Sequence, residues 1–215
     1  MSLKRGLSRG FLISLLCAVF FGLIALSIRD NKIHNFDSTI ISWVQGMESS
    51  GLTQWMKGLS WIGTGLPVVG VTLLVMLFLY GVLGHRRELI FLVGVCVGSA
   101  LLNGLLKAVF QRARPTIHRI AEATGYSFPS GHSMAAFTLY GALAYLLWRH
   151  IPALLGRILL IAAALLLILG IGISRIYLGV HYPSDVLGGY LASGCLLAAA
   201  IWCAGPYLHG GRGHV

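Results

Sequence analysis

Long apolar stretches alternate with short polar segments along the whole chain. A helix needs about 20 mostly apolar residues, and at least about 17, to cross the hydrocarbon core of a bilayer. Because the backbone must satisfy its own hydrogen bonds in lipid, and because the sequence lacks the strict alternation of a β-barrel, we expect helices. Six stretches fit or nearly fit this length: Phe11–Ile28, Leu66–Leu83, Leu89–Leu106, Ser133–Trp148, Ile158–Ile173 and Val186–Ala204. The pattern predicts an all-α, polytopic membrane protein with six transmembrane helices in one domain over residues 1–215, the two shortest stretches (133–148 and 158–173) being extended by flanking residues.

Composition supports the membrane class. Of the 215 residues, 57% are apolar and 10% are charged, whereas soluble chains carry about 25% charged residues. So few charges could not cover a soluble domain, and the apolar content excludes a disordered chain. The formal net charge is +10, but the basic residues are spread through the gaps between apolar stretches, which argues against a nucleic-acid partner. The four cysteines lie inside apolar stretches, where we expect them to pack without disulfides.

The first span and the segment after it need separate interpretation. A basic segment precedes Phe11–Ile28, as in a signal peptide, but the apolar core is longer than such peptides usually have, so we expect it to be retained. In residues 29–65, Asp37-Ser38-Thr39 can cap a helix, and the tryptophans Trp43, Trp55 and Trp61 favour the headgroup level. This predicts one or two short interfacial helices in the first outer loop, which serve either as a plain cap or as a gate for lipid entry.

Three polar clusters interrupt the apolar pattern, each at the end of a predicted span. They are Lys107–Pro115, Phe128–Ser133 and Ser174–Asp185. In the six-span topology they follow the third span, precede the fourth and connect the fifth to the sixth, so all three lie on one side of the membrane. This convergence indicates a functional site within residues 107–185.

The residue types in these clusters point to phosphate. Lys107, Arg114 and Arg175 supply fixed positive charge, and the guanidinium forks match phosphate oxygens. Ser130 and Gly131 stand where a helix begins, so free backbone N–H groups and the positive end of the helix dipole favour an anion there. The sequence therefore predicts a phosphate-binding site made of these five residues.

Two histidines supply the reactive groups. His181 and Asp185 are four residues apart, so one helical turn can place the carboxylate beside the imidazole. A carboxylate on one ring nitrogen fixes the tautomer and leaves the other nitrogen as a nucleophile. His132 is then available as the acid that protonates the leaving oxygen.

Other polar residues at span ends are interpreted as ordinary interfacial side chains. Arg112 and Arg119 are expected to anchor the chain at the membrane surface. The histidines with the same interpretation are His85, His150, His209 and His214.

The three clusters read K-x6-R-P, P-S-G-H and S-R-x5-H-x3-D in this order. This chain thereby resembles the type 2 phosphatidic acid phosphatase superfamily, whose three signature motifs it matches at every position. The six-span layout and the outer loop with Asp37 are similar to the bacterial membrane members.

The resemblance implies a mechanism and a class of substrate. His181 would form a phosphohistidine, Asp185 would orient it, and His132 would protonate the leaving group and then activate water. No metal and no cofactor would be needed. The substrate would be a lipid phosphate in the bilayer, such as undecaprenyl diphosphate, phosphatidylglycerophosphate or phosphatidic acid; oligomeric state stays open.

Two other functions remain to be separated from this one. Haloperoxidases share the motifs, so a vanadate-dependent oxidase is one alternative, although those enzymes are soluble. A transporter or channel is the other, because ionisable residues in spans mark transport pathways, but here they gather at one face. Metal-independent release of phosphate from a lipid would distinguish the phosphatase from a transporter.

Orientation follows from the basic residues. With the N-terminus inside, eight Lys and Arg residues fall on each side. Setting aside the three assigned to phosphate leaves eight cytoplasmic against five. Because cytoplasmic loops carry the excess, we expect both termini in the cytoplasm and the active site on the extracytoplasmic face.

Overall fold

The computed structural model describes residues 2–63, 65–81, 86–116 and 118–209. Within these residues the chain forms eight α-helices and no β-strand. The helices are α1 (Ser2–Arg29), α2 (His34–Gln45), α3 (Ser50–Ile62), α4 (Gly65–Gly81), α5 (Arg86–Phe110), α6 (Gly131–Trp148), α7 (Leu154–Tyr177) and α8 (Pro183–His209).

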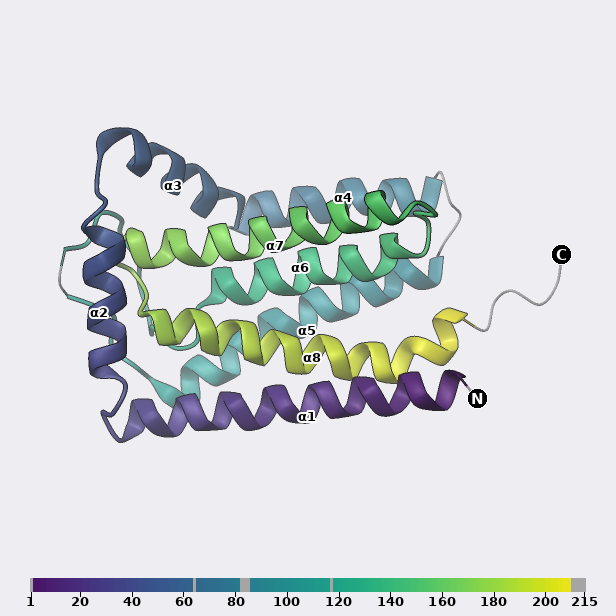
Figure 1. The fold of residues 1–215 in the computed structure, drawn as a ribbon, viewed down its shortest axis with the longest axis horizontal. Coiled ribbons are helices and arrows are strands. Elements are labelled where there is room, and N and C mark those ends of the chain that lie inside the picture. Colours follow the sequence, from purple (N-terminus) through teal and green to yellow (C-terminus); the bar gives the residue numbers. More distant parts are fainter. Residues whose placement is uncertain (1, 64, 82–85, 117, 210–215) are drawn as a thin grey trace, which may run out of the picture.

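Six helices form an elongated bundle. Figure 1 shows α1 and α4 to α8 running along the long axis, with α2 lying across one end. Helix α6 packs against α5, α7 and α8, and α1 packs along α8. The main apolar core lies between α5, α6, α7 and α8, and Leu92, Leu139, Leu146 and Ile171 are completely buried in it. The helix that carries His132 is therefore held at the centre of the bundle.

The described helices include all six predicted spans, apart from residues 82 and 83 of the second, which lie outside the described residues. Four helical segments are long and apolar enough on their own to cross a membrane: Arg9–Arg29, Arg87–Phe110, Leu154–Tyr177 and Pro183–Gly205. Helices α3 and α4 form a bent pair that would add a fifth span if it crosses as one unit. Helix α6 is short, and because half of its residues are buried against other helices, it needs less apolar surface. The chain is a multi-pass membrane protein; the count of six stays a prediction.

The segment between the first two predicted spans contains α2 and α3. Ser49 caps α3 through its side chain, which accepts a hydrogen bond from the backbone N–H of Leu52 at 3.3 Å. The prediction that Asp37 lies at a helix cap is wrong: α2 begins at His34, and Asp37 is a buried residue inside it. Its carboxylate binds side chains of other elements, described below. The placement of α2 and α3 at the membrane interface stays a prediction.

A second apolar cluster fixes the connection between α7 and α8. Tyr177, Leu178 and Val180 are buried there against Val44 of α2. The Tyr177 hydroxyl also forms a hydrogen bond with the Thr53 hydroxyl of α3 at 2.8 Å. Helices α2 and α3 thus hold the connection that carries His181.

Candidate active site

The structure brings the residues of the three motifs together at the end of the bundle that α2 crosses (Figure 1). They come from different elements: Lys107 from α5, Arg114 from the segment after it, Ser130, Gly131 and His132 from the start of α6, Arg175 from the last turn of α7, His181 from the connection to α8, and Asp185 from the first turn of α8. His132 lies within electrostatic range of the other histidine and of all three cations. The predicted convergence is therefore present in the fold.

His181 is buried between a carboxylate and a guanidinium group. Its side chain is only 2% exposed, and Nδ1 lies 3.4 Å from Oδ2 of Asp185. Its Nε2 lies 3.2 Å from an Arg114 guanidinium nitrogen. Burial lowers the pKa of His181 to about 4, although Asp185 opposes this shift. At neutral pH the ring is uncharged, with a lone pair available on the nitrogen that does not face Asp185.

The Asp185 carboxylate is completely buried and has a donor on each oxygen. Oδ2 accepts hydrogen bonds from the backbone N–H of Tyr182 at 2.9 Å and from the Ser127 hydroxyl. Oδ1 accepts one from Arg112 at 2.6 Å. His181 lies in the turn before α8, so this turn, and not a regular helical turn as the sequence suggested, brings the pair together.

Arg114 is fixed by backbone carbonyl groups. Its guanidinium donates to the carbonyl oxygens of Thr124 at 2.8 Å, Gly125 at 2.9 Å and Val180 at 2.9 Å. Burial lowers the pKa of Arg114 somewhat, but an arginine remains charged at neutral pH. The site therefore holds a preoriented cation beside His181.

Two further side-chain nitrogen atoms are candidates for binding a ligand. Within the described part of the chain, Nε of Arg175 and Nε2 of His132 are buried and have no hydrogen-bond partner. Another nitrogen of Arg175 donates to the Ser60 hydroxyl of α3. Because unpaired buried polar atoms are costly, these two nitrogens are suited to an anionic ligand.

The start of α6 is tied to α8. Ser130 is the N-cap: its hydroxyl oxygen accepts from the Ser133 hydroxyl at 2.9 Å and from the Ser133 backbone N–H at 3.4 Å. The Ser130 backbone N–H donates to the carbonyl oxygen of Asp185 at 3.0 Å. The predicted helix start is confirmed, and the first backbone N–H groups of α6, including that of Gly131, lie at the site.

Arg112 and Asp37 support the site from behind Asp185, and the sequence did not predict this. Arg112 is not a surface anchor: its side chain is 15% exposed and pairs with both Asp185 and Asp37. The partners of Arg112 are 73 and 75 residues away in the sequence, so no local pattern could predict this role. The only signal was that Arg112 stands between two residues of the first motif. Arg119, in contrast, is exposed.

The four histidines predicted to be interfacial side chains do not contribute described contacts to the site. His150 is half-buried, with Nε2 3.6 Å from the Glu88 carboxylate. His85 and His214 lie outside the described residues, and the side chain of His209 does as well. Among the residues that the structure describes, no group of three or more His, Cys, Asp or Glu side chains is arranged to hold a metal ion.

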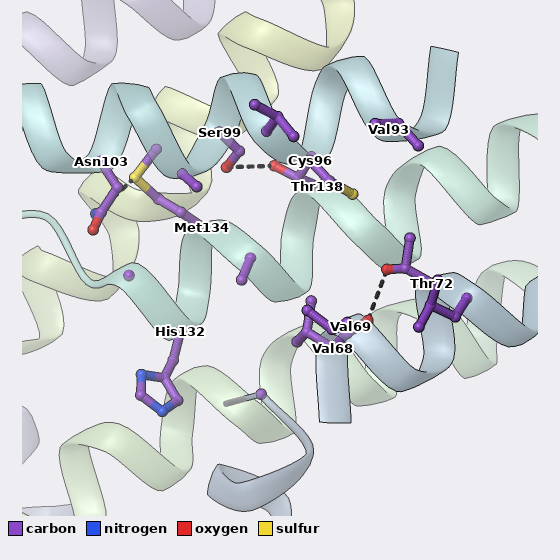
Figure 2. Close-up of a pocket in the computed structure, with 16 residues that line it drawn as sticks. Val68, Val69, Thr72, Val93, Cys96, Ser99, Asn103, His132, Met134 and Thr138 are labelled. Carbon is purple, nitrogen blue, oxygen red and sulfur yellow. Dashed lines mark hydrogen bonds between the residues drawn. The ribbon is translucent and has the colours of Figure 1, made fainter. Parts of the chain in front are cut away.

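A cavity of about 510 Å³ extends from His132 between α4, α5 and α6 (Figure 2). Half of the residues that line it are valine, leucine, alanine or methionine. Two hydroxyl groups in its wall already have partners: Thr138 donates to Ser99 at 3.0 Å, and Thr72 donates to the Val68 carbonyl oxygen at 2.7 Å. The wall therefore presents an apolar surface next to His132.

Several named proteins and one crystal structure are similar to this chain over most of its length. The chain is 33% identical to phosphatidylglycerophosphatase B of Bacillus subtilis, over 80% of this chain and 85% of the relative. It is also 33% identical, with the same coverage, to YbjG of Escherichia coli, a candidate undecaprenyl-diphosphatase. The crystal structure of a transmembrane PAP2-type phosphatidylglycerolphosphate phosphatase from Bacillus subtilis superposes with a TM-score of 0.76 at 29% identity, covering 87% of this chain and 94% of that one.

These similar proteins place the chain in the class of membrane phosphatases. The sequence pattern of the PAP2 superfamily matches residues 87–208, which contain all three motifs. The chain belongs to the PAP2 superfamily, and the resemblance drawn from the motifs is confirmed.

Proposed function

We propose that this protein removes phosphate from a membrane lipid, a monoester or a diphosphate, through a phosphohistidine on His181. The observation that carries the proposal is the buried, neutral His181 with Asp185 on one ring nitrogen and a fixed cation beside the other. Undecaprenyl diphosphate, phosphatidylglycerophosphate and phosphatidic acid are the substrates proposed, because relatives carry the first two activities in their names.

In the first half-reaction, Nε2 of His181 attacks phosphorus and the bond to the leaving oxygen breaks. His132 donates a proton to that oxygen. In the second half-reaction His132 takes a proton from water, the water oxygen attacks phosphorus, and the P–N bond breaks to release phosphate and free His181. Since Arg114 contacts Nε2 in the structure, phosphate must enter between these two groups.

Fixed charge would stabilise the transition state. Lys107, Arg114 and Arg175 would surround the phosphoryl group, and the N-terminal end of α6 at Ser130 and Gly131 would add backbone donors. These groups supply the positive charge that many phosphoryl-transfer enzymes take from Mg²⁺. We therefore propose a metal-independent, cofactor-free reaction.

The lipid tail is proposed to occupy the cavity beside His132. Val69, Leu73 and Val97 line it, and each is about half exposed, so the cavity is open between α4 and α5. In a bilayer this opening faces hydrocarbon, and a tail could enter sideways with its headgroup at the site.

Orientation completes the proposal. Both chain ends would be cytoplasmic and the site extracytoplasmic, because α1 begins and α8 ends at the end of the bundle opposite the site (Figure 1). Once the three cations assigned to phosphate are set aside, the predicted cytoplasmic loops also carry more Lys and Arg. A C-terminal fusion to a fluorescent protein that folds only in the cytoplasm should therefore fluoresce.

The decisive experiment measures released phosphate. Purified protein in detergent is given each of the three proposed lipids, and glycerol phosphate as a substrate without a tail. We expect rapid release from at least one lipid and little from glycerol phosphate, and none from lipid with the His181→Ala variant. No release from any lipid phosphate would contradict the proposal and leave a transporter or an oxidase to test.

A further inference from the structure

Helix α2 reaches the active site through one buried carboxylate. Oδ2 of Asp37 accepts hydrogen bonds from Arg112 at 2.8 Å and from the Ser184 hydroxyl at 2.7 Å. Oδ1 accepts one from the Ser184 backbone N–H at 2.9 Å. The other terminal nitrogen of Arg112 donates to Asp185 at 2.6 Å. A continuous chain of contacts thus runs from α2 through Arg112 to the residue that supports His181.

The charges in this chain of contacts alternate. Asp37 and Asp185 are negative and Arg112 is positive, so the cluster carries a net charge of −1. The side chains are 3%, 0% and 15% exposed, respectively. Because water screens such a cluster little, adding or removing one charge there changes the potential at neighbouring groups strongly.

The net charge matters for His181. When its Nε2 bonds to phosphorus, the imidazole becomes positively charged, and a negative group behind it stabilises that charge. Arg112 alone would largely cancel the charge of Asp185. Asp37 pairs with the other terminal nitrogen of Arg112, so the net charge of the cluster stays negative.

We propose that Asp37 and Arg112 are positioning residues of the reaction: Arg112 orients Asp185, and Asp37 keeps the cluster negative so that Asp185 can stabilise the phosphohistidine. This inference rests on the proposed phosphatase function. Neither residue belongs to the phosphate-binding set, so both act through Asp185.

The proposal predicts a change in kcat without a matching change in KM or in phosphate binding. In Asp37→Asn the cluster becomes neutral, and kcat should fall about ten- to a hundredfold, as expected for a charge lost in a buried cluster. KM and inhibition by inorganic phosphate should change less than about threefold, because the phosphate site is intact. Asp30→Asn is the matched control, since Asp30 is exposed and pairs only with Lys32 among the contacts described.

A double variant tests charge against simple loss of packing. Arg112→Gln alone leaves two buried carboxylates without their shared cation, and should also reduce kcat. Asp37→Asn combined with Arg112→Gln returns the net charge to −1, so its kcat should exceed that of either single variant. It should stay below that of wild type, because the contact from Arg112 that orients Asp185 is still missing.

The outcomes are distinct. Recovery in the double variant with unchanged phosphate inhibition supports the proposal. It is overturned if Asp37→Asn matches the Asp30→Asn control in kcat, if phosphate inhibition is lost, or if the losses of the single variants multiply in the double one, as a purely structural role would give. Failure of the underlying function looks different, because wild-type protein would then release no phosphate from any lipid.

Discussion

The two histidines of the site differ in their surroundings. His181 has Asp185 against Nδ1, whereas Nε2 of His132 is buried and has no hydrogen-bond partner among the described residues. A carboxylate-supported imidazole is suited to nucleophilic attack, and an imidazole with a free nitrogen is suited to proton transfer.

This difference predicts how two variants respond to the leaving group. A lipid alkoxide leaves poorly and needs the acid, whereas p-nitrophenolate leaves readily. In the first turnover, before His132 is needed to activate water, His132→Ala should slow release of the lipid leaving group about 100- to 10,000-fold but release of p-nitrophenolate far less. His181→Ala should lose nearly all activity on both. Equal losses for His132→Ala on the two substrates would show that it is not the acid.

The burial of His181 also predicts its titration. Its pKa is lowered to about 4 in the folded protein from about 6.5 for an unperturbed histidine. Between these values the unfolded chain binds the extra proton, so this group destabilises the fold as the pH falls from 6.5 to 4.

The titration can be measured without substrate. Diethyl pyrocarbonate acylates only neutral imidazole, and in a His132→Ala background the reaction that phosphate blocks should report on His181. Its rate should stay constant from pH 8 to 5 and fall only near pH 4. A midpoint near 6.5 would indicate a solvated ring.

At the scale of elements, the connection between α7 and α8 depends on one glycine. Gly179 has a φ of +70°, and a Cβ there would lie 2.3 Å from the carbonyl oxygen of His118. A side chain would strain the backbone and displace His181, two residues further on.

Gly179→Ala should therefore lower both stability and activity. We expect a loss of at least about 1–2 kcal/mol from the left-handed backbone alone, seen as a lower Tm in detergent, together with a reduced kcat. Gly51→Ala is the control, because that exposed position in α3 has open space around its Cβ and alanine favours a helix. Equal Tm values for the two variants would contradict this account.

The cavity between α4, α5 and α6 gives a prediction about the lipid tail. Ala135 of α6 lines the cavity, so Ala135→Trp should fill part of it and reduce kcat/KM on the long-chain lipid at least about tenfold. Turnover of p-nitrophenyl phosphate should change little. Ala163→Trp, at an exposed position of α7, should leave both activities unchanged. Equal losses on both substrates in Ala135→Trp would mean that the tail binds elsewhere.

The apolar pattern was enough to predict the helices but not their contacts. Helix ends follow local signals, as at the Ser130 cap, and the spacing of His181 and Asp185 correctly placed them together. Asp37, Arg112 and Ser60 had no such signal, because their partners are 72 to 147 residues distant in the sequence. Only the packing of α2 and α3 across the end of the bundle creates those contacts. The apparent cap at Asp37-Ser38-Thr39 misled for the same reason, since the buried pairing of Asp37 overrides its usual local role.

For the whole molecule, the source of positive charge gives a prediction about metals. If Lys107, Arg114, Arg175 and the α6 N-terminus act in place of Mg²⁺, activity should persist in excess EDTA. Vanadate should inhibit, because it adopts the five-coordinate geometry of the transferring phosphorus. Activity abolished by EDTA and restored by Mg²⁺ would require a different mechanism.

The sideways opening of the cavity implies that the surface concentration of lipid, and not its bulk concentration, controls the rate. Val69, Leu73 and Val97 line this opening and are each about half exposed. If the lipid tail enters there, the substrate arrives by diffusion within the plane of the membrane and not from water. The rate should then follow the mole fraction of lipid in the micelle or membrane. Adding inert detergent at a fixed bulk amount of lipid should slow the reaction by surface dilution, whereas turnover of p-nitrophenyl phosphate should not respond.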